Sequence, residues 1–207
     1  MEISYYGGNC LKINAKKASI VIDDNLASLG HKSVSKPDDI ALTTSDHIGH
    51  GVGRLVIAGP GEYEVSDISI QGVAARGSMD EPNTKKATIY KITADDITVA
   101  VLGHVFAEIT DEEFEELGHI DVLFVPVGGN GYTLDGVDAL KLIKKIEPKV
   151  VVPTHYADSS IKYEVPQASL EDAVKGLAME PSQTVQKLKL KAAEIPENLS
   201  LYVLERS

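Results

Sequence analysis

The stretch DIALTTSDHIGH, from Asp39 to His50, is where a short apolar run gives way to a cluster of polar and imidazole side chains. Residues 40–43 are too few and too rich in β-branched side chains for a helix. The residues after them are types that bond their own backbone or coordinate ions. The pattern predicts a buried strand that runs into a turn, and functional groups usually lie on such loops.

Further strands and three helices are predicted on either side of this stretch. Helix 110–117 begins with a capping box formed by Thr110 and Glu113. Helix 135–147 ends before Pro148, and Ser169 caps a helix over 170–179. In the second helix the spacing predicts that Val137, Leu140, Ile143 and Ile146 face inward. We expect strands over 3–6, 10–13, 19–23, 40–43, 55–58, 68–74, 88–92, 97–102, 120–127 and 149–152.

The chain is expected to form a single domain over residues 1–207, with 184–206 as a C-terminal β-hairpin. The hairpin strands are predicted over 184–191 and 199–205. The first of these alternates leucine with lysine, so it has one apolar and one basic face. We interpret it as a sheet edge or a subunit contact, which predicts a homo-oligomer.

Composition limits the partners and the compartment. The 207 residues are 43% hydrophobic and 25% charged, which is typical of a globular domain. A formal net charge of -11 disfavours nucleic acid as the main partner. The single cysteine, Cys10, excludes an intramolecular disulfide and fits a reducing compartment. With no signal-like start and no apolar run long enough to span a bilayer, we predict a cytoplasmic protein without a membrane contact.

Four more motifs follow the opening stretch along the chain. They are GPGEYEV at 59–65, Leu-Gly-His at 102–104, PVGGNGYT at 126–133 and PTHY at 153–156. Together with DIALTTSDHIGH, in this order, they resemble the metallo-β-lactamase fold over most of residues 1–165. Within that fold the sequence is similar to the small metal-dependent hydrolases that include the L-ascorbate-6-phosphate lactonases. The resemblance implies an α/β protein built as a four-layer αββα sandwich of two mixed β-sheets.

The metal motif of that family is incomplete in this sequence. The family motif Thr-His-x-His-x-Asp-His falls on residues 44–50, where Ser45 and Gly49 occupy two ligand positions. Shifting the register onto Asp46 and His47 instead puts Leu42 and Thr44 in the two earlier positions. No histidine occurs between His50 and His104 to complete the first metal pocket. Either alignment leaves a dinuclear centre without enough ligands.

The resemblance places His50, His104 and His155 around the second metal of the family. Three neutral imidazoles and a water make an open zinc site of a known kind, in which His47 would act as a proton acceptor or as a fourth ligand. The family's residue at His104 is usually a bridging aspartate, and an imidazole cannot bridge two cations. The lost carboxylates therefore favour a metal-free protein, or one with at most one zinc.

Two functions from different classes remain open. One is a mononuclear zinc hydrolase of a small phosphorylated or lactone-like metabolite, with His47 as the catalytic residue and His50, His104 and His155 as ligands. The other, favoured here, is a metal-free member of the fold that binds a small molecule or partner in the same cleft, or that only assembles through its sheet edges. A glycine-rich turn contributes a candidate substrate rim made of Gly128, Gly129, Asn130 and Tyr132.

Overall fold

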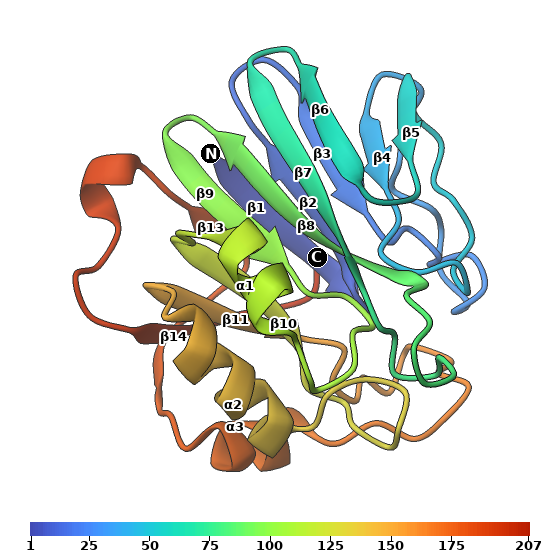
Figure 1. Cartoon of the computed structure of the whole chain (residues 1–207), viewed down its shortest axis with the longest axis vertical. Helices are drawn as coiled ribbons and strands as arrows, with labels where there is room; N and C mark the ends of the chain where they lie inside the picture. Colours follow the sequence, from blue (N-terminus) through green and yellow to red (C-terminus); the bar gives the residue numbers. More distant parts are fainter.

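Two mixed β-sheets pack face to face in the computed structural model, which describes all residues from Met1 to Ser207 (Figure 1). The first is a six-stranded sheet in the order β13-β1-β2-β3-β4-β5. Its first three sequential strands are antiparallel to one another, whereas β4 and β5 add in parallel. Its strands are β1 (Glu2–Gly7), β2 (Cys10–Asn14), β3 (Ser19–Ile22), β4 (Ile40–Leu42), β5 (Leu55–Ile57) and β13 (Leu188–Lys189).

The second sheet has eight strands in the order β12-β14-β11-β10-β9-β8-β7-β6. β9, β10 and β11 are parallel, so their carboxyl ends reach the same edge. Strands β6 to β9 form an antiparallel meander. The strands are β6 (Gly61–Val65), β7 (Ile68–Ala75), β8 (Ala87–Ala94), β9 (Ile97–Val101), β10 (Val122–Pro126), β11 (Val150–Thr154), β12 (Pro181–Val185) and β14 (Ser200–Leu204).

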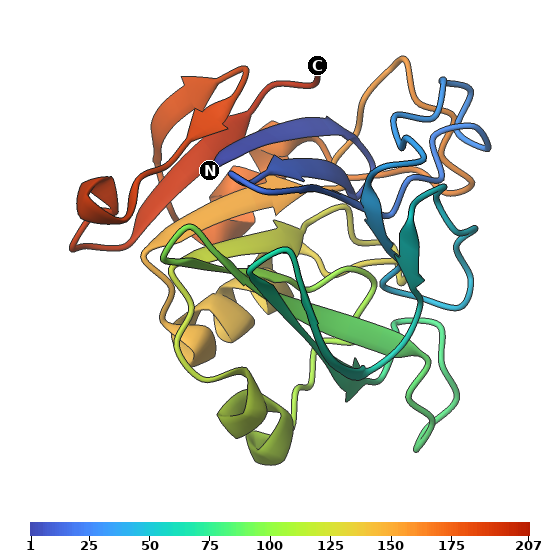
Figure 2. The same ribbon diagram turned by 90° about the horizontal axis from the view of Figure 1, so that it is seen from above.

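Three α-helices lie along the outer side of the eight-stranded sheet (Figures 1 and 2). They are α1 (Asp111–Leu117), α2 (Gly136–Ile146) and α3 (Leu170–Leu177), and a short 3-10 turn covers Ala192–Glu194. The predicted capping box of α1 and the predicted caps of α2 and α3, Asp135 and Ser169, are all present. The α/β class and the two mixed sheets expected from the resemblance are confirmed.

The central strand β10 shows how the core is divided. Its apolar side chains alternate between the space separating the sheets, which takes Val122 and Phe124, and the space under the helices, which takes Leu123 and Val125. Every residue of β10 is buried. A continuous apolar run is therefore required here, because both faces of the strand are covered.

The predicted C-terminal hairpin is wrong. β12 and β14 pair with each other in parallel, and β14 lies between β12 and β11. Leu188 and Lys189 form the separate strand β13, which pairs with β1 in the other sheet. The alternation of leucine and lysine does give this segment one buried and one exposed face, since Leu188 and Leu190 are buried and Lys189 and Lys191 are exposed. The strand with which this segment pairs, however, is set by tertiary packing, which a local sequence pattern does not predict.

The predicted inward face of α2 is corrected in part. Ile143 and Ile146 are buried as expected, but Val137 is 54% exposed and Ala139 and Leu142 are buried instead. A close approach between α2 and α3 sets this rotation, because a Cβ added to Gly136 would lie 2.9 Å from the Gly176 Cα.

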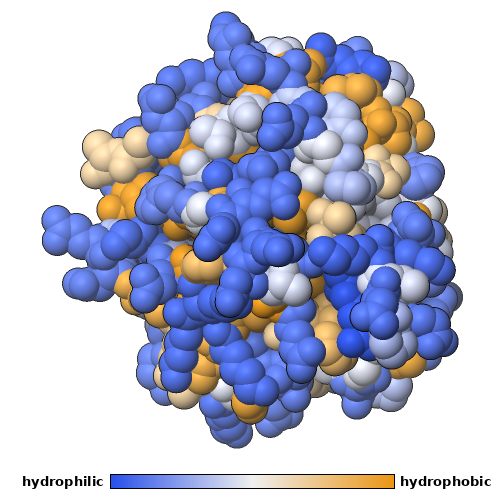
Figure 3. All heavy atoms as spheres, viewed as in Figure 1, coloured by the Kyte–Doolittle hydropathy of each residue, from blue (hydrophilic) through white to orange (hydrophobic).

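The surface is mostly polar on the face in Figure 3, with an apolar area over β5 and smaller apolar areas elsewhere. Val52 and Val56 are among the few large apolar side chains that are exposed. None of the helices is both long enough and apolar enough to cross a lipid bilayer.

The pairing of β13 with β1 predicts a measurable contrast between two leucines of the C-terminal segment. Leu188 is 3% exposed and packs in the core between the sheets, whereas Leu199 is 45% exposed. Leu188→Ala should lower the free energy of unfolding by about 2–5 kcal/mol. Leu199→Ala should change it by about 0.5 kcal/mol or less. Urea unfolding of both variants checks this, and equal losses would contradict the placement of β13.

Candidate functional site

The carboxyl ends of the parallel strands β9, β10 and β11 gather the candidate residues at one edge of the eight-stranded sheet. His104 follows β9, Tyr132 lies in the loop after β10, and His155 follows β11 directly. The loop after β4, which carries Ser45 and His47, reaches the same place from the other sheet, since Ser45 bridges to Ala87. Side chains more than 100 positions apart in the sequence therefore lie together.

The backbone leading to these histidines adopts unusual conformations. Gly103 has φ +61°, and a Cβ there would lie 2.2 Å from the Thr44 hydroxyl oxygen, so only glycine fits before His104. His155 itself has φ +54°, which is uncommon for a residue with a side chain. Its backbone N–H donates to the Gly8 carbonyl at 2.8 Å, which helps to hold this turn.

Four aromatic rings pack around this point. The His104 ring meets His155 and Tyr132 edge to face, with centroid separations of 5.2 and 5.1 Å. Tyr163 lies on the other side of His155 at 5.1 Å. His104 is 7% exposed and His155 only 3%. Burial, with His155 and His47 nearby, lowers the pKa of His104 to about 3, and burial lowers the pKa of His155 to about 4.

The polar neighbours of His104 determine which ring nitrogen carries its proton. Thr154 donates its hydroxyl hydrogen to the Asn9 side-chain oxygen at 2.9 Å, which orients the amide. The Asn9 NH₂ then faces His104 Nδ1 at 3.3 Å. Because Nδ1 accepts this hydrogen bond, the proton of the neutral ring lies on Nε2. That Nε2 atom is buried and has no hydrogen-bond partner.

His155 has the opposite arrangement. Gln167 donates its side-chain NH₂ to the Val165 carbonyl at 2.8 Å, so its oxygen is turned toward the histidine. His155 Nδ1 donates to that oxygen at 3.0 Å. The neutral ring therefore keeps a lone pair on Nε2. The two buried imidazoles thus present complementary groups, one donor and one acceptor.

His47 lies at the mouth of this cluster. Its side chain is 48% exposed, and its Nε2 atom lies 3.7 Å from the Asp80 Oδ1. Asp80 is buried, and its Oδ2 accepts hydrogen bonds from the Gly77 and Lys86 backbone N–H groups. Burial raises the pKa of Asp80, but these two hydrogen bonds and His47 outweigh it and leave the pKa below its usual value. Asp80 Oδ1 has no hydrogen-bond partner.

A buried carboxyl supports the loop from below. Asp23 accepts hydrogen bonds from both the backbone N–H and the hydroxyl of Thr44, at 2.7 and 2.6 Å. The side chain is almost fully buried, and this burial raises its pKa from 3.8 to about 7, against the opposing effect of Thr44. Asp23 therefore fixes the end of β4 where the candidate residues begin.

The structure does not bring the three predicted zinc ligands together. His104 and His155 are neighbours, but His50 is exposed and its Nδ1 lies 3.2 Å from the Thr43 hydroxyl. No group of three or more His, Cys, Asp or Glu side chains is arranged to hold a metal ion. The predicted set of His50, His104 and His155 is therefore corrected, because the turn after His47 carries His50 away from the two buried rings.

The chemistry of the remaining donors also fits a metal poorly. A metal ligand must offer a lone pair, and His155 Nε2 does so while its Nδ1 is held by Gln167, as in metal sites. With the Asn9 amide oriented by Thr154, His104 Nδ1 is the acceptor, and we infer that Nε2 carries the ring hydrogen instead. The two positions that hold ligands in the family motif are filled by Ser45 and Gly49, and Gly49 has no atom within 4 Å of where a Cβ would lie.

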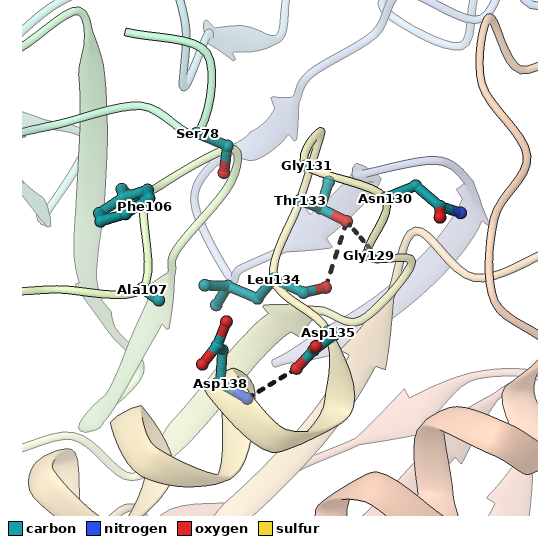
Figure 4. A pocket seen from close by; sticks show the side chains of 10 residues that line it. All are labelled: Ser78, Phe106, Ala107, Gly129, Asn130, Gly131, Thr133, Leu134, Asp135 and Asp138. Carbon is teal, nitrogen blue, oxygen red and sulfur yellow. Dashed lines mark hydrogen bonds between the residues drawn. The ribbon is translucent and has the colours of Figure 1, made fainter. Parts of the chain in front are cut away.

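Two cavities adjoin the cluster. The smaller, of about 10 Å³, is lined by Ser45, His47, Ile48, Gly77, Ser78, Met79, His104 and Tyr132. The larger, of about 140 Å³, shares Ser78 with it and is lined by the loop after β10 and the start of α2 (Figure 4). Figure 4 shows Ser78 on one side of this space and the Asp135 and Asp138 side chains on the other.

The predicted rim residues are divided between these features. Gly129 and Asn130 line the larger cavity, and Tyr132 lines the smaller one. Gly128 packs beneath them, where a Cβ would lie 1.9 Å from the Gln167 side-chain oxygen. Their roles toward a ligand stay predictions.

Asn9, Asp80 and Gln167 are site residues that the sequence reasoning missed. Asn9 follows Gly7-Gly8 in the first turn, the place where the resembled family often carries a histidine, and that comparison could have drawn attention to it. Asp80 and Gln167 lie in polar loops without any periodic or motif signal.

Comparisons with known proteins agree on the fold. The family described as the beta-lactamase superfamily domain matches residues 2–155. A UPF0173 metal-dependent hydrolase of Enterococcus faecalis is 35% identical, and the match covers 89% of this chain and 99% of that protein. A UPF0173 protein of Pyrococcus abyssi is 26% identical over 75% of this chain and 83% of its own length.

Solved structures extend the likeness to the whole chain. A Thermotoga maritima protein assigned to the Zn-dependent hydrolases of the metallo-beta-lactamase superfamily superposes with a TM-score of 0.80 and 26% identity, covering 99% of each chain. A metallo hydrolase from Ignicoccus hospitalis superposes with a TM-score of 0.65 at 18% identity, over 100% of this chain and 95% of that one.

Buried Asp23 predicts a specific pH dependence of stability. Its pKa is raised from 3.8 to about 7 in the folded protein, so its contribution is fully present below pH 3.8 and is lost as the pH rises through about 7. Asparagine imitates the protonated carboxyl at every pH. The stability of Asp23→Asn relative to the unaltered protein should therefore increase by about 1–4 kcal/mol between pH 4 and pH 7.

Urea unfolding at a series of pH values measures this difference. Asp38→Asn removes an exposed carboxylate and serves as the control, which should lack the increase. The prediction fails if the difference in unfolding free energy between Asp23→Asn and the unaltered protein does not change with pH across this range. Asp23 would then be ionised in the folded protein.

Proposed function

The chain belongs to the UPF0173 metal-dependent hydrolases of the beta-lactamase superfamily, and we propose that it is a divergent member that works without the family's metal centre. It binds a small molecule in the cleft where β9, β10 and β11 end. The names of its relatives imply a metal cofactor of unspecified identity for the family. We propose that the side chains in the cleft of this protein offer too few lone pairs to hold that metal.

The hydrogen bond between Asn9 and His104 is the observation that carries this proposal. It places the proton of His104 on Nε2, which removes the lone pair that a metal would need there. Only His155 is then prepared as a ligand, and an open zinc site needs three protein ligands. Protein groups from Asn9 and Gln167 orient the two rings in place of a metal.

The alternative is a mononuclear zinc hydrolase that uses His50, His104 and His155, with His47 as the proton acceptor. The names of the relatives favour it. This zinc hydrolase would require two changes. The contact between Thr43 and His50 must break, and the Asn9 side-chain amide must flip so that the ring proton of His104 moves from Nε2 to Nδ1.

Metal analysis distinguishes the two functions. Protein purified without chelators should contain far less than one zinc per chain, and its melting temperature should not change in EDTA. The Enterococcus faecalis relative, purified in parallel, provides the positive control for metal retention. His119→Ala, which alters an exposed histidine outside the cleft, is the control variant.

Near-stoichiometric zinc would contradict the proposal if it is lost in both His104→Ala and His155→Ala but kept in His119→Ala. Zinc that is equally lost or kept in all three variants would instead indicate binding outside the cleft and leave the metal-free cleft in place.

A further inference from the structure

The smaller cavity contains a hydrogen-bond donor that the protein itself does not use. His104 is 7% exposed, its Nδ1 is occupied by Asn9, and its Nε2 is buried without a partner. Buried polar groups are almost always hydrogen-bonded, so each exception indicates a missing partner. The His104 side chain lines the smaller cavity together with Ser45, His47 and Tyr132.

We propose that the cavity binds the terminal carbonyl or hydroxyl oxygen of a neutral small molecule, with the His104 Nε2–H as the donor. This inference rests on the proposed function, because a metal would need the same nitrogen without its hydrogen. The cavity volume of about 10 Å³ has room for a group about the size of a water molecule, such as a single oxygen. The rest of the molecule must therefore lie outside it.

The larger cavity provides room for the rest of the molecule. It has a volume of about 140 Å³ and shares one lining residue, Ser78, with the smaller cavity (Figure 4). Phe106, Ala107 and Leu134 give it an apolar part, and the Thr133 hydroxyl is already used by the Gly129 backbone N–H. A compact molecule of a few heavy atoms, with its oxygen directed at His104, fits this shape.

The carboxylates near the cavities disfavour an anion, and the one guanidinium nearby, that of Arg76, is stacked on the Phe106 ring at 4.1 Å. Asp80 presents a buried, unpartnered carboxylate oxygen 3.7 Å from the His47 ring that lines the smaller cavity. Asp135 and Asp138 line the larger one, and Lys141 pairs with only one oxygen of Asp138. His104 carries a single ring proton and adds no positive charge. A phosphate or carboxylate would be repelled here, whereas a neutral acceptor is not.

A matched pair of probes tests this selectivity. Acetamide and acetate have the same size, but only acetamide is neutral. Each is titrated into the full-length protein at pH 7 and constant ionic strength, while the imidazole ¹⁵N signals of His104 and the backbone signals of Ser78 and Met79 are followed by NMR. Acetamide should shift these signals saturably and bind about fivefold or more tightly than acetate, as expected for one used hydrogen bond and no charge repulsion.

Two variants locate the binding. His104→Phe keeps a ring but removes the Nε2–H, so it should weaken acetamide binding about fivefold or more. His119→Ala changes an exposed ring that pairs with Asp121 outside the cavity, and should leave binding unchanged. If His104→Phe does not fold, the comparison of acetamide with acetate on the unaltered protein still decides the question.

Acetate binding as tightly as acetamide, or no saturable shift with either probe, would overturn the inference. Equal acetamide affinity in a folded His104→Phe would also overturn it. The metal question is tested separately. Stoichiometric zinc that shifts the NMR signals of both His104 and His155 counts against the proposed function. A zinc-free protein that does not bind acetamide counts only against this inference.

Discussion

The side-chain amide of Asn9 connects three parts of the fold at the centre of the cleft. It lies in the turn between β1 and β2, accepts from Thr154 at the end of β11 and faces His104 after β9. Because an amide has one donor side and one acceptor side, its orientation decides the protonation of the histidine. The two sheets meet here, because β1 and β2 belong to the six-stranded sheet and β9 and β11 to the eight-stranded one.

Under the proposed function, the polar groups of the cleft are held by the protein rather than by a cation. Gln167 holds His155 in the opposite tautomer, and Asp23 fixes Thr44 beneath the loop of His47. Burial keeps both rings neutral, with pKa values of about 3 and about 4. A relative of the chain is named as a metal-dependent hydrolase, and we propose that this chain uses the same end of the fold with a different set of donors. The unpartnered groups, His104 Nε2 and Asp80 Oδ1, are where a ligand would complete the arrangement.

Most of the secondary structure could be predicted from the sequence because its causes are local. The capping box of Thr110 and Glu113 and the apolar run of β10 follow from neighbouring residues alone. The parallel pairing of β12 with β14 could not be predicted, since an alternating pattern indicates a strand but not which strand it pairs with. The motifs placed His104 and His155 just beyond two strand ends, and in the structure they follow β9 and β11, the two strands that flank β10. The direction of His50 depends on the turn between β4 and β5, which no periodic pattern describes.

The most direct test of this account is the tautomeric state of the two buried histidines. Long-range ¹H–¹⁵N correlation spectra of the imidazoles at pH 7 report which ring nitrogen carries the hydrogen. The account predicts that His104 is protonated on Nε2 alone and His155 on Nδ1 alone. A hydrogen on Nδ1 of His104, or two hydrogens on either ring, would contradict it.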